Sequence, residues 1–313
     1  MADSGSTQRH PFVSLILLLL LIFAGAIIFT LLGAAIAAAV YGLPDLLKFL
    51  GGDLSANISL TKLIQISSSI GMFIIPAIFF SRLENRDWQS YLKLNSFSPQ
   101  LVVLTIVIMY FSVPLLELSV EVNKSMKLPG FLQDLESWMR RQEDQMAELT
   151  RQLLTMKTIG SLLINLLMLA IIPAIGEEFI FRGCLQRLFK QLTNNHHIAI
   201  WLTAFIFSAI HMQFYGFLPR MLLGAMFGYL LVWSNSLWLP ILAHFVNNAT
   251  AVVTAYVYQQ QGKSLEQLDQ PERSHWLVYL ISLALTIILL WTFYQRAKAP
   301  KAVIKNSDGT RLD

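Results

Sequence analysis

Long stretches without any charged residue alternate with short polar segments along the chain. These charge-free runs occupy residues 11–44, 63–81, 94–116, 158–176, 221–262 and 276–295. A membrane-spanning helix needs about 20 predominantly apolar residues. The run from 221 to 262 is long enough for two helices with a turn at Ser234-Asn235-Ser236, and another helix is expected to begin near Ile198. The pattern therefore predicts an all-α, polytopic membrane helix bundle of about eight transmembrane helices.

The same runs divide the chain into four predicted parts. Residues 1–120 carry helices one to three, 121–157 form a polar loop, 158–258 carry helices four to seven, and 259–313 carry the last helix and a basic tail. The first apolar run is far longer than the core of a signal peptide, which has about 7–15 residues, so we expect an uncleaved helix. The polar loop is too short to build its own core.

The polar loop has its own periodic pattern. Its apolar positions alternate between spacings of four and three, with charges of both signs between them, and they are Leu135, Met139, Gln142, Met146, Leu149, Leu153 and Met156. This spacing predicts an amphipathic helix. Such a helix lies on the bilayer surface or against the bundle; a substrate lid and a dimer coiled coil are the alternatives.

Composition supports the membrane class, and the basic residues favour one orientation. The chain is 55% hydrophobic and only 13% charged, whereas soluble domains have about 25% charged residues. With eight spans and both termini inside, twelve of the 23 Lys and Arg residues lie in inner segments, and six of the other eleven belong to the polar loop. We therefore expect an integral, multi-pass protein of the plasma (inner) membrane with cytoplasmic termini. The net charge of +4 comes mostly from the basic tail and favours contact with the lipid bilayer over nucleic acid.

Two adjacent glutamates follow the charge-free run at 158–176. A carboxylate at membrane depth costs roughly 2.5–3.5 kcal/mol on insertion scales, so it needs partners and a function. Because helical positions i and i+4 share a face, Glu178 is expected to pair with Arg182, while Glu177 points about 100° away. Ordinary cap residues in water, at the end of a helix leaving the membrane, are the alternative. The single cysteine, Cys184, excludes an intrachain disulfide and is expected to be structural.

Three more polar residues lie in later apolar segments. His211 is four residues after Phe207, and Asn248 is four residues after His244. The segment 193–197 is the expected turn between two helices, and Glu177 and His211 are each 17 residues from Asn194. If both arms are helical, the two side chains lie at similar depth. A satisfied polar contact at the histidine and interhelical glue at the asparagine are the alternatives for single residues, but three spans with inward polar groups favour one shared site.

The order Glu-Glu-x-x-x-Arg, Phe-x-x-x-His, His-x-x-x-Asn resembles the CPBP intramembrane proteases. That family includes the CaaX-processing endopeptidases, the bacterial Abi proteins and the lysostaphin-resistance-protein-A-like proteins. The resemblance covers about residues 158–258, and all its signature positions are present: Glu177, Glu178, Arg182, His211, His244 and Asn248. It implies an endopeptidase that cleaves a membrane-associated protein or peptide: a prenylated CaaX protein, a bacteriocin-like precursor or a membrane-anchored protein.

Peptide hydrolysis requires an activated water and stabilisation of an oxyanion. Glu177 is the predicted general base, with His211 positioning the water. His244 and Asn248 are expected to face the oxyanion, and Glu178 with Arg182 to hold the charge balance.

A metal-dependent version of the reaction uses the same atoms. Glu177, His211 and His244 would bind a divalent metal such as zinc and leave a position open for water. The family is often called metalloprotease, and a glutamate-activated water without metal is also proposed for it. No His-Glu-x-x-His motif is present, and the sequence leaves both versions open.

Two other classes of protein compete with a protease. A proton-coupled transporter would also bury Glu and His, but it predicts an inverted repeat and polar groups along a path, and neither is visible in the sequence. A membrane regulatory or binding protein that kept the motif without proteolysis is the stronger alternative.

Overall fold

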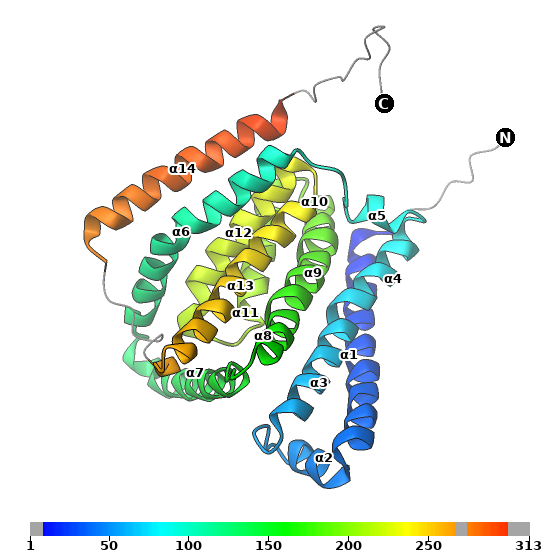
Figure 1. Ribbon diagram of the computed structural model, residues 1–313. Helices are drawn as coiled ribbons and strands as arrows, with labels where there is room; N and C mark the ends of the chain where they lie inside the picture. The colour runs from blue at the N-terminus through cyan, green and yellow to red at the C-terminus, as the bar shows by residue number, and fades with distance from the viewer. Residues whose placement is uncertain (1–8, 267–273, 300–313) are drawn as a thin grey trace, which may run out of the picture.

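The structure is a computed structural model that describes residues 9–266 and 274–299. Figure 1 shows long helices running side by side, and the two views agree that α7 lies across one end of them. The predicted all-α membrane helix bundle is confirmed. The predicted basic tail, with Lys301, Lys305 and Arg311, lies outside the described residues.

The bundle begins with two antiparallel rods. The first is α1 (Pro11–Tyr41), and the second combines α3 (Ile58–Ser69), the π-helical turn η1 (Ile70–Ile74) and α4 (Ile75–Glu84), with α2 (Leu43–Leu50) at the connection between the rods. After α5 (Trp88–Tyr91) come α6 (Pro99–Ser125), the short 3₁₀ turn η2 (Gly130–Leu132) and α7 (Gln133–Leu153).

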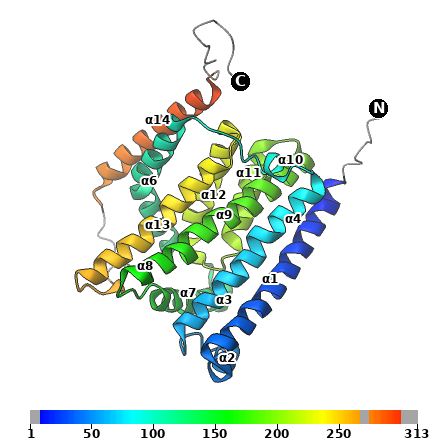
Figure 2. The same cartoon turned by 45° about the vertical axis from the view of Figure 1, so that its right-hand side comes forward.

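A continuous rod follows from residue 159 to 193. It consists of α8 (Ile159–Leu166), η3 (Leu167–Ile171), α9 (Ile172–Glu178), η4 (Phe179–Leu185) and α10 (Gln186–Thr193), where η3 and η4 are π-helical. The remaining elements are α11 (His196–Ala209), η5 (Phe214–Gly216), α12 (Phe217–Ser234), α13 (Trp238–Gln260) and α14 (Trp276–Lys298). Figure 2 shows α9 and α13 lying between the α1–α4 pair and the α6–α14 pair.

Within the described residues, six helices are long and apolar enough to cross a membrane. They are Pro11–Tyr41, Ile58–Glu84, Pro99–Ser125, Ile159–Thr193, Phe214–Ser234 and Trp276–Lys298. The other two predicted spans differ from these: α11 has only 14 residues, and α13 is long enough but carries His244, Asn247 and Asn248, which lower its mean hydropathy. The chain is an integral membrane protein.

Left-handed asparagines make both predicted turns. Asn194 and Asn235 have φ of 52° and 54°, a conformation that Asn adopts more readily than most residues. They follow α10 and α12, and the side chain of Asn195 caps α11 by accepting from the N–H groups of His197 and Ile198. We call this end of the bundle the Asn194 end; α1 begins there and α14 ends there (Figure 1).

The prediction that His211 lies on a helix is wrong. The helix α11 ends at Ala209, and Met212 takes a left-handed φ of 53°. The physical reason is that the chain must reverse direction between Ala209 and Phe217, where α12 begins. The inference that Glu177 and His211 lie at equal depth assumed a helix on each side of Asn194. The helix after Asn194 ends before His211, so this inference does not hold as it was made.

The amphipathic helix is confirmed as α7, although Met156 lies beyond its end and α6 runs to Ser125, into the predicted loop. It packs against the segment that contains His211: the ring of Trp138 lies 6.0 Å from that of Phe214, and Glu143 accepts from the backbone N–H of Tyr215 (3.3 Å). These contacts favour the prediction that the helix lies against the bundle; the lid and the coiled coil stay predictions.

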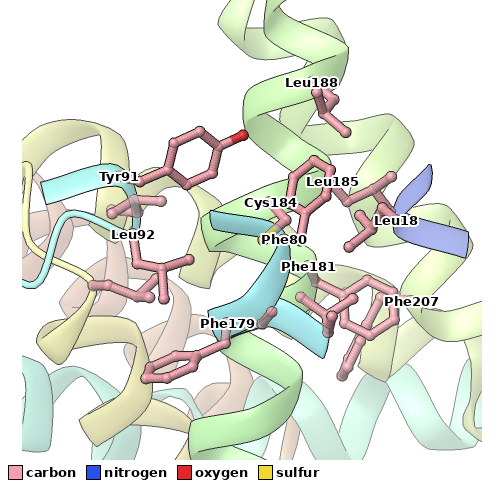
Figure 3. Close-up of a cluster of buried hydrophobic side chains, with 14 of the residues drawn as sticks. Leu18, Phe80, Tyr91, Leu92, Phe179, Phe181, Cys184, Leu185, Leu188 and Phe207 are labelled. Carbon is pink, nitrogen blue, oxygen red and sulfur yellow. The ribbon is translucent and has the colours of Figure 1, made fainter. Parts of the chain in front are cut away.

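Aromatic side chains fill the core around η4. Figure 3 shows Phe80 and Phe181 close to Cys184 in a cluster that also contains Phe179 and Phe207. Cys184 is fully buried, as expected of a structural cysteine. The rod from 159 to 193 packs closely against the rod formed by α3, η1 and α4. This approach requires a glycine at Gly176, because a Cβ there would lie 2.7 Å from Cβ of Phe73.

Candidate active site

A proline distorts the rod that carries the glutamates. Pro173 has no N–H, so the carbonyl of Leu169, four residues earlier, lacks its usual helical donor. The π-helical turn η3 spans this place, and Nδ2 of Asn248 on α13 donates to the Leu169 carbonyl (3.0 Å). Asn247 in turn donates to the side-chain oxygen of Asn248 (3.1 Å). Asn248 therefore joins α13 to the distorted rod.

Glu178 and Arg182 form a buried ion pair, as their spacing predicts. Nη1 of Arg182 lies 2.8 Å from Oε1 of Glu178, and both side chains are 0% exposed. Arg182 also donates to the carbonyl of Gly224 on α12 (3.1 Å). Its guanidinium carbon lies 4.6 Å from the ring centre of Phe207 and 5.4 Å from that of Phe227. These rings and the carbonyl fix the cation from three sides.

His244 connects the two glutamates. Its Nδ1 lies 2.8 Å from Oε1 of Glu178, and its Nε2 lies 3.8 Å from Oε2 of Glu177. Because the carboxylate of Glu178 is held by Arg182 and accepts hydrogen bonds, Nδ1 of His244 donates the proton. Nε2 of His244 then faces Glu177. The ring is further fixed by stacking on Phe227, with centres 5.5 Å apart.

Glu177 is the partly accessible member of this group, with 15% of its side chain exposed. Arg220, in the first turns of α12, lies within electrostatic range of Glu177 and of His211. Gln213 accepts hydrogen bonds from this guanidinium through its side chain and its backbone carbonyl. Arg220 was not among the predicted site residues, yet the sequence carries a signal: it is the only Asp, Glu, Lys or Arg between Lys190 and Lys263.

His211 is held by the end of α11. Its Nδ1 donates to the carbonyl of Phe207 (2.7 Å), which preserves a four-residue contact although the helix has ended. Among the described residues no hydrogen bond or ion pair joins His211 or Asn248 to either glutamate. Like Arg220, His244 lies within electrostatic range of both Glu177 and His211.

The predicted metal ligands were tested against this geometry. In the part of the chain that the structure describes, no group of three His, Cys, Asp or Glu side chains is arranged to hold a metal ion. The Nδ1 atoms of His211 and His244 are both engaged in hydrogen bonds, which leaves their Nε2 atoms as the possible ligands. In this arrangement Glu177, His211 and His244 do not come together as a metal site, and metal dependence stays a prediction.

The fold and this site define an integral membrane protein with an acid–base cluster buried in its helix bundle. Residues 159–250 match the sequence model of a family described as "Type II CAAX prenyl endopeptidase Rce1-like". This segment runs from the start of α8 into α13 and contains all six predicted site residues. Over these residues, the match confirms the resemblance to the CPBP family.

One curated relative extends the comparison. The chain is 25% identical over 114 residues to "Uncharacterized protein YpbD" of Bacillus subtilis (strain 168), which covers 35% of this chain and 56% of the relative. The chain thus spans about half the length of the curated relative that it matches. No solved structure matches the chain.

Proposed function

We propose that the chain is an intramembrane endopeptidase that hydrolyses a peptide bond in a membrane-associated protein or peptide. The observation that carries this proposal is the placement of His244 between two buried glutamates, one fixed by an arginine and one partly accessible. Buried ionisable groups inside a membrane protein are costly and mark functional sites. The family match over the same residues supports this reaction class.

The hydrolytic water belongs between Glu177 and His244. Their facing atoms are 3.8 Å apart, too far for a direct hydrogen bond but suited to a water about 2.8 Å from each. One water proton then points to Glu177 and the other to Nε2 of His244. This arrangement favours His244, rather than His211, as the histidine that orients the water, so the proposed roles of the two histidines differ from those expected from the sequence.

The proton transfers balance within this group. As the water oxygen bonds to the peptide carbon, Glu177 takes one proton and the carbonyl becomes an oxyanion. When the carbon–nitrogen bond breaks, Glu177 returns that proton to the leaving amine. Asn248 uses one N–H for Leu169 and has a second for the oxyanion, while the charge of Arg220 stabilises developing negative charge. His211 contributes Nε2 as a further polar contact for the substrate.

The substrate class follows from the family, not from the geometry. A prenylated CaaX protein is the substrate that the family description favours; a bacteriocin-like precursor and a membrane-anchored protein are the other classes that the motif resemblance implies. The test therefore uses peptides of each kind, tethered to proteoliposomes that contain the purified protein.

The variant Glu177→Gln is expected to lower cleavage about 100- to 10,000-fold, the usual loss on removing a general base. The matched control is Glu148→Gln on α7, whose side chain is 56% exposed and which should cleave like wild type. Cleavage by Glu177→Gln near the wild-type rate would contradict the proposal. Wild-type protein that binds these peptides and cleaves none would support the non-proteolytic alternative instead.

A further inference from the structure

A polar cavity lies at the Asn194 end, and Arg182 is the one residue of the proposed site among the described residues that line it. It has a volume of about 310 Å³, and its polar lining includes Lys93, Gln186, Arg187, Lys190, Gln191 and His196. None of the described residues that line it is acidic. Its walls come from the loop after α5 and from η4, α10, α11 and α12, so it is built from segments distant in the sequence.

The guanidinium of Arg187 and the backbone of Lys93 are held in place before any ligand binds. Arg187 donates to the backbone carbonyl of Tyr91 (2.9 Å) and lies over the Tyr91 ring, 4.1 Å from its centre. Lys93 has a left-handed φ of 57°, and its carbonyl accepts from the N–H of Leu237 (2.8 Å). Ordered cations lose less entropy on binding an anion than mobile surface lysines do.

These cations also repel one another. Burial, together with the nearby charges of Arg187 and Lys190, lowers the pKa of Lys93. The neighbouring carboxylate at the end of α4, Glu84, is engaged with Arg9 (3.1 Å). Positive charges gathered around a cavity without a carboxylate among its lining residues are stabilised when an anion enters.

The inner wall of the cavity contains two buried side chains, each with one polar atom that makes no hydrogen bond to a described residue. Arg182 and Gln186 both line it and are 1% and 5% exposed. Nε of Arg182 and Oε1 of Gln186 have no hydrogen-bond partner among the described residues. Nearly all buried polar atoms in proteins find a partner, so this wall can still donate one hydrogen bond and accept another.

We propose that this cavity binds a phosphate group carried by an anionic ligand. Phosphate oxygens match the arginine and lysine donors, and hydroxyl groups beside the phosphate would donate to Gln186. The cavity lies where α10 ends and α11 begins, and the ends of membrane-spanning helices are where phospholipid headgroups are expected. Basic pockets between transmembrane helices recognise such headgroups. The headgroup of a phosphatidylglycerol lipid and a small soluble phosphate ester share this chemistry.

The test measures binding, so its outcome is independent of the proposed protease activity. Full-length protein is reconstituted in nanodiscs of phosphatidylcholine alone or with phosphatidylglycerol, and in phosphatidylcholine with added glycerol phosphate. Thermal unfolding and retained lipid are measured for each. We expect phosphatidylglycerol or glycerol phosphate to raise the unfolding temperature. A rise with the lipid alone identifies a headgroup site, and a rise with glycerol phosphate identifies a site for soluble phosphate.

The variant Lys93→Gln/Lys190→Gln is expected to weaken this binding at least about tenfold, as loss of charge-assisted hydrogen bonds should. The matched control Arg296→Gln/Lys298→Gln removes two exposed cations of α14 at the same end and should bind like wild type. Lys190→Glu, at an exposed position, keeps the test valid if the double variant does not fold. Equal loss in the control, or no response of wild type to either ligand, would overturn the proposal.

Discussion

Glu178 is the residue on which the geometry of the site depends most. Its Oε1 atom accepts from Arg182 and from His244, each at 2.8 Å. Removing Arg182 leaves this fully buried carboxylate without its cation, and removing His244 leaves Arg182 as its remaining donor among the described residues. Arg182 therefore positions His244 through Glu178 in addition to balancing charge.

At this scale we expect Arg182→Ala to lower the free energy of unfolding by about 3–5 kcal/mol, because it leaves Glu178 as an unpaired buried charge. Thermal or denaturant unfolding in detergent measures the change. Arg141→Ala removes an exposed arginine of α7 and should unfold like wild type. An Arg182→Ala protein with wild-type stability but no activity would show that Arg182 acts in the chemistry.

A second prediction at the residue scale concerns Arg220. Loss of its charge in Arg220→Gln should lower the cleavage rate about 100- to 1,000-fold, as loss of an oxyanion-stabilising group does, without unfolding the protein. Gly216→Ala should have a smaller effect of the same kind, because a Cβ at Gly216 would lie 2.5 Å from Nη2 of Arg220 and displace it. Cleavage rates and unfolding temperatures are compared. Unchanged rates in both variants would show that Arg220 takes no part.

The contacts of single residues were predictable only within one helix. The spacing of Glu178 and Arg182 predicts their pairing, because helical periodicity fixes which side chains meet. The contact of His244 with both glutamates depends on how α13 is rotated against α9. That rotation results from packing between helices, which spacing along the chain does not encode.

Among the elements, a proline in the rod from 159 to 193 leaves a backbone carbonyl that is paired by a side chain of another helix. Pro173 leaves the Leu169 carbonyl without its helical donor, and Asn248 supplies one (3.0 Å). The turns at Asn194 and Asn235 and the helix α7 were predictable from turn residues and from periodicity. The π-helical turns and the end of α11 were not, because both depend on contacts between helices.

A double-mutant cycle tests this link between elements. Asn248→Ala should cost about 1–3 kcal/mol, the cost of leaving a buried carbonyl without a donor. In a Pro173→Ala background the new N–H can serve Leu169, so the same substitution should cost less. Unfolding free energies of the four proteins measure the coupling. Equal costs of Asn248→Ala in both backgrounds would show that the Leu169 contact is not what stabilises Asn248.

For the whole molecule, α7 lies on the side of the bundle opposite to the start of α1 and the end of α14 (Figure 1). The distribution of Lys and Arg predicts cytoplasmic termini. With that orientation, α7 is predicted to lie on the outer side of the membrane. Cys184 is fully buried, so the wild-type protein serves as an unreactive control for thiol labelling.

Single cysteines at exposed positions test this orientation: Gln145→Cys on α7 and Gln295→Cys near the end of α14. A membrane-impermeant thiol reagent added to intact cells should modify Gln145→Cys, and should modify Gln295→Cys only after the membrane is opened. The reverse pattern would contradict the predicted orientation and leave the fold unaffected.

The most direct test of the central claim follows the hydrolytic water itself. Reconstituted protein cleaves a membrane-tethered peptide in water enriched in oxygen-18, with and without a chelator, and the products are weighed by mass spectrometry. In a single turnover the wild-type protein should place one oxygen-18 in the new carboxyl terminus and none in the enzyme, and Glu177→Gln should form product at least about 100-fold more slowly. Oxygen-18 on Glu177, or labelled product from Glu177→Gln at the wild-type rate, would contradict a glutamate-activated water.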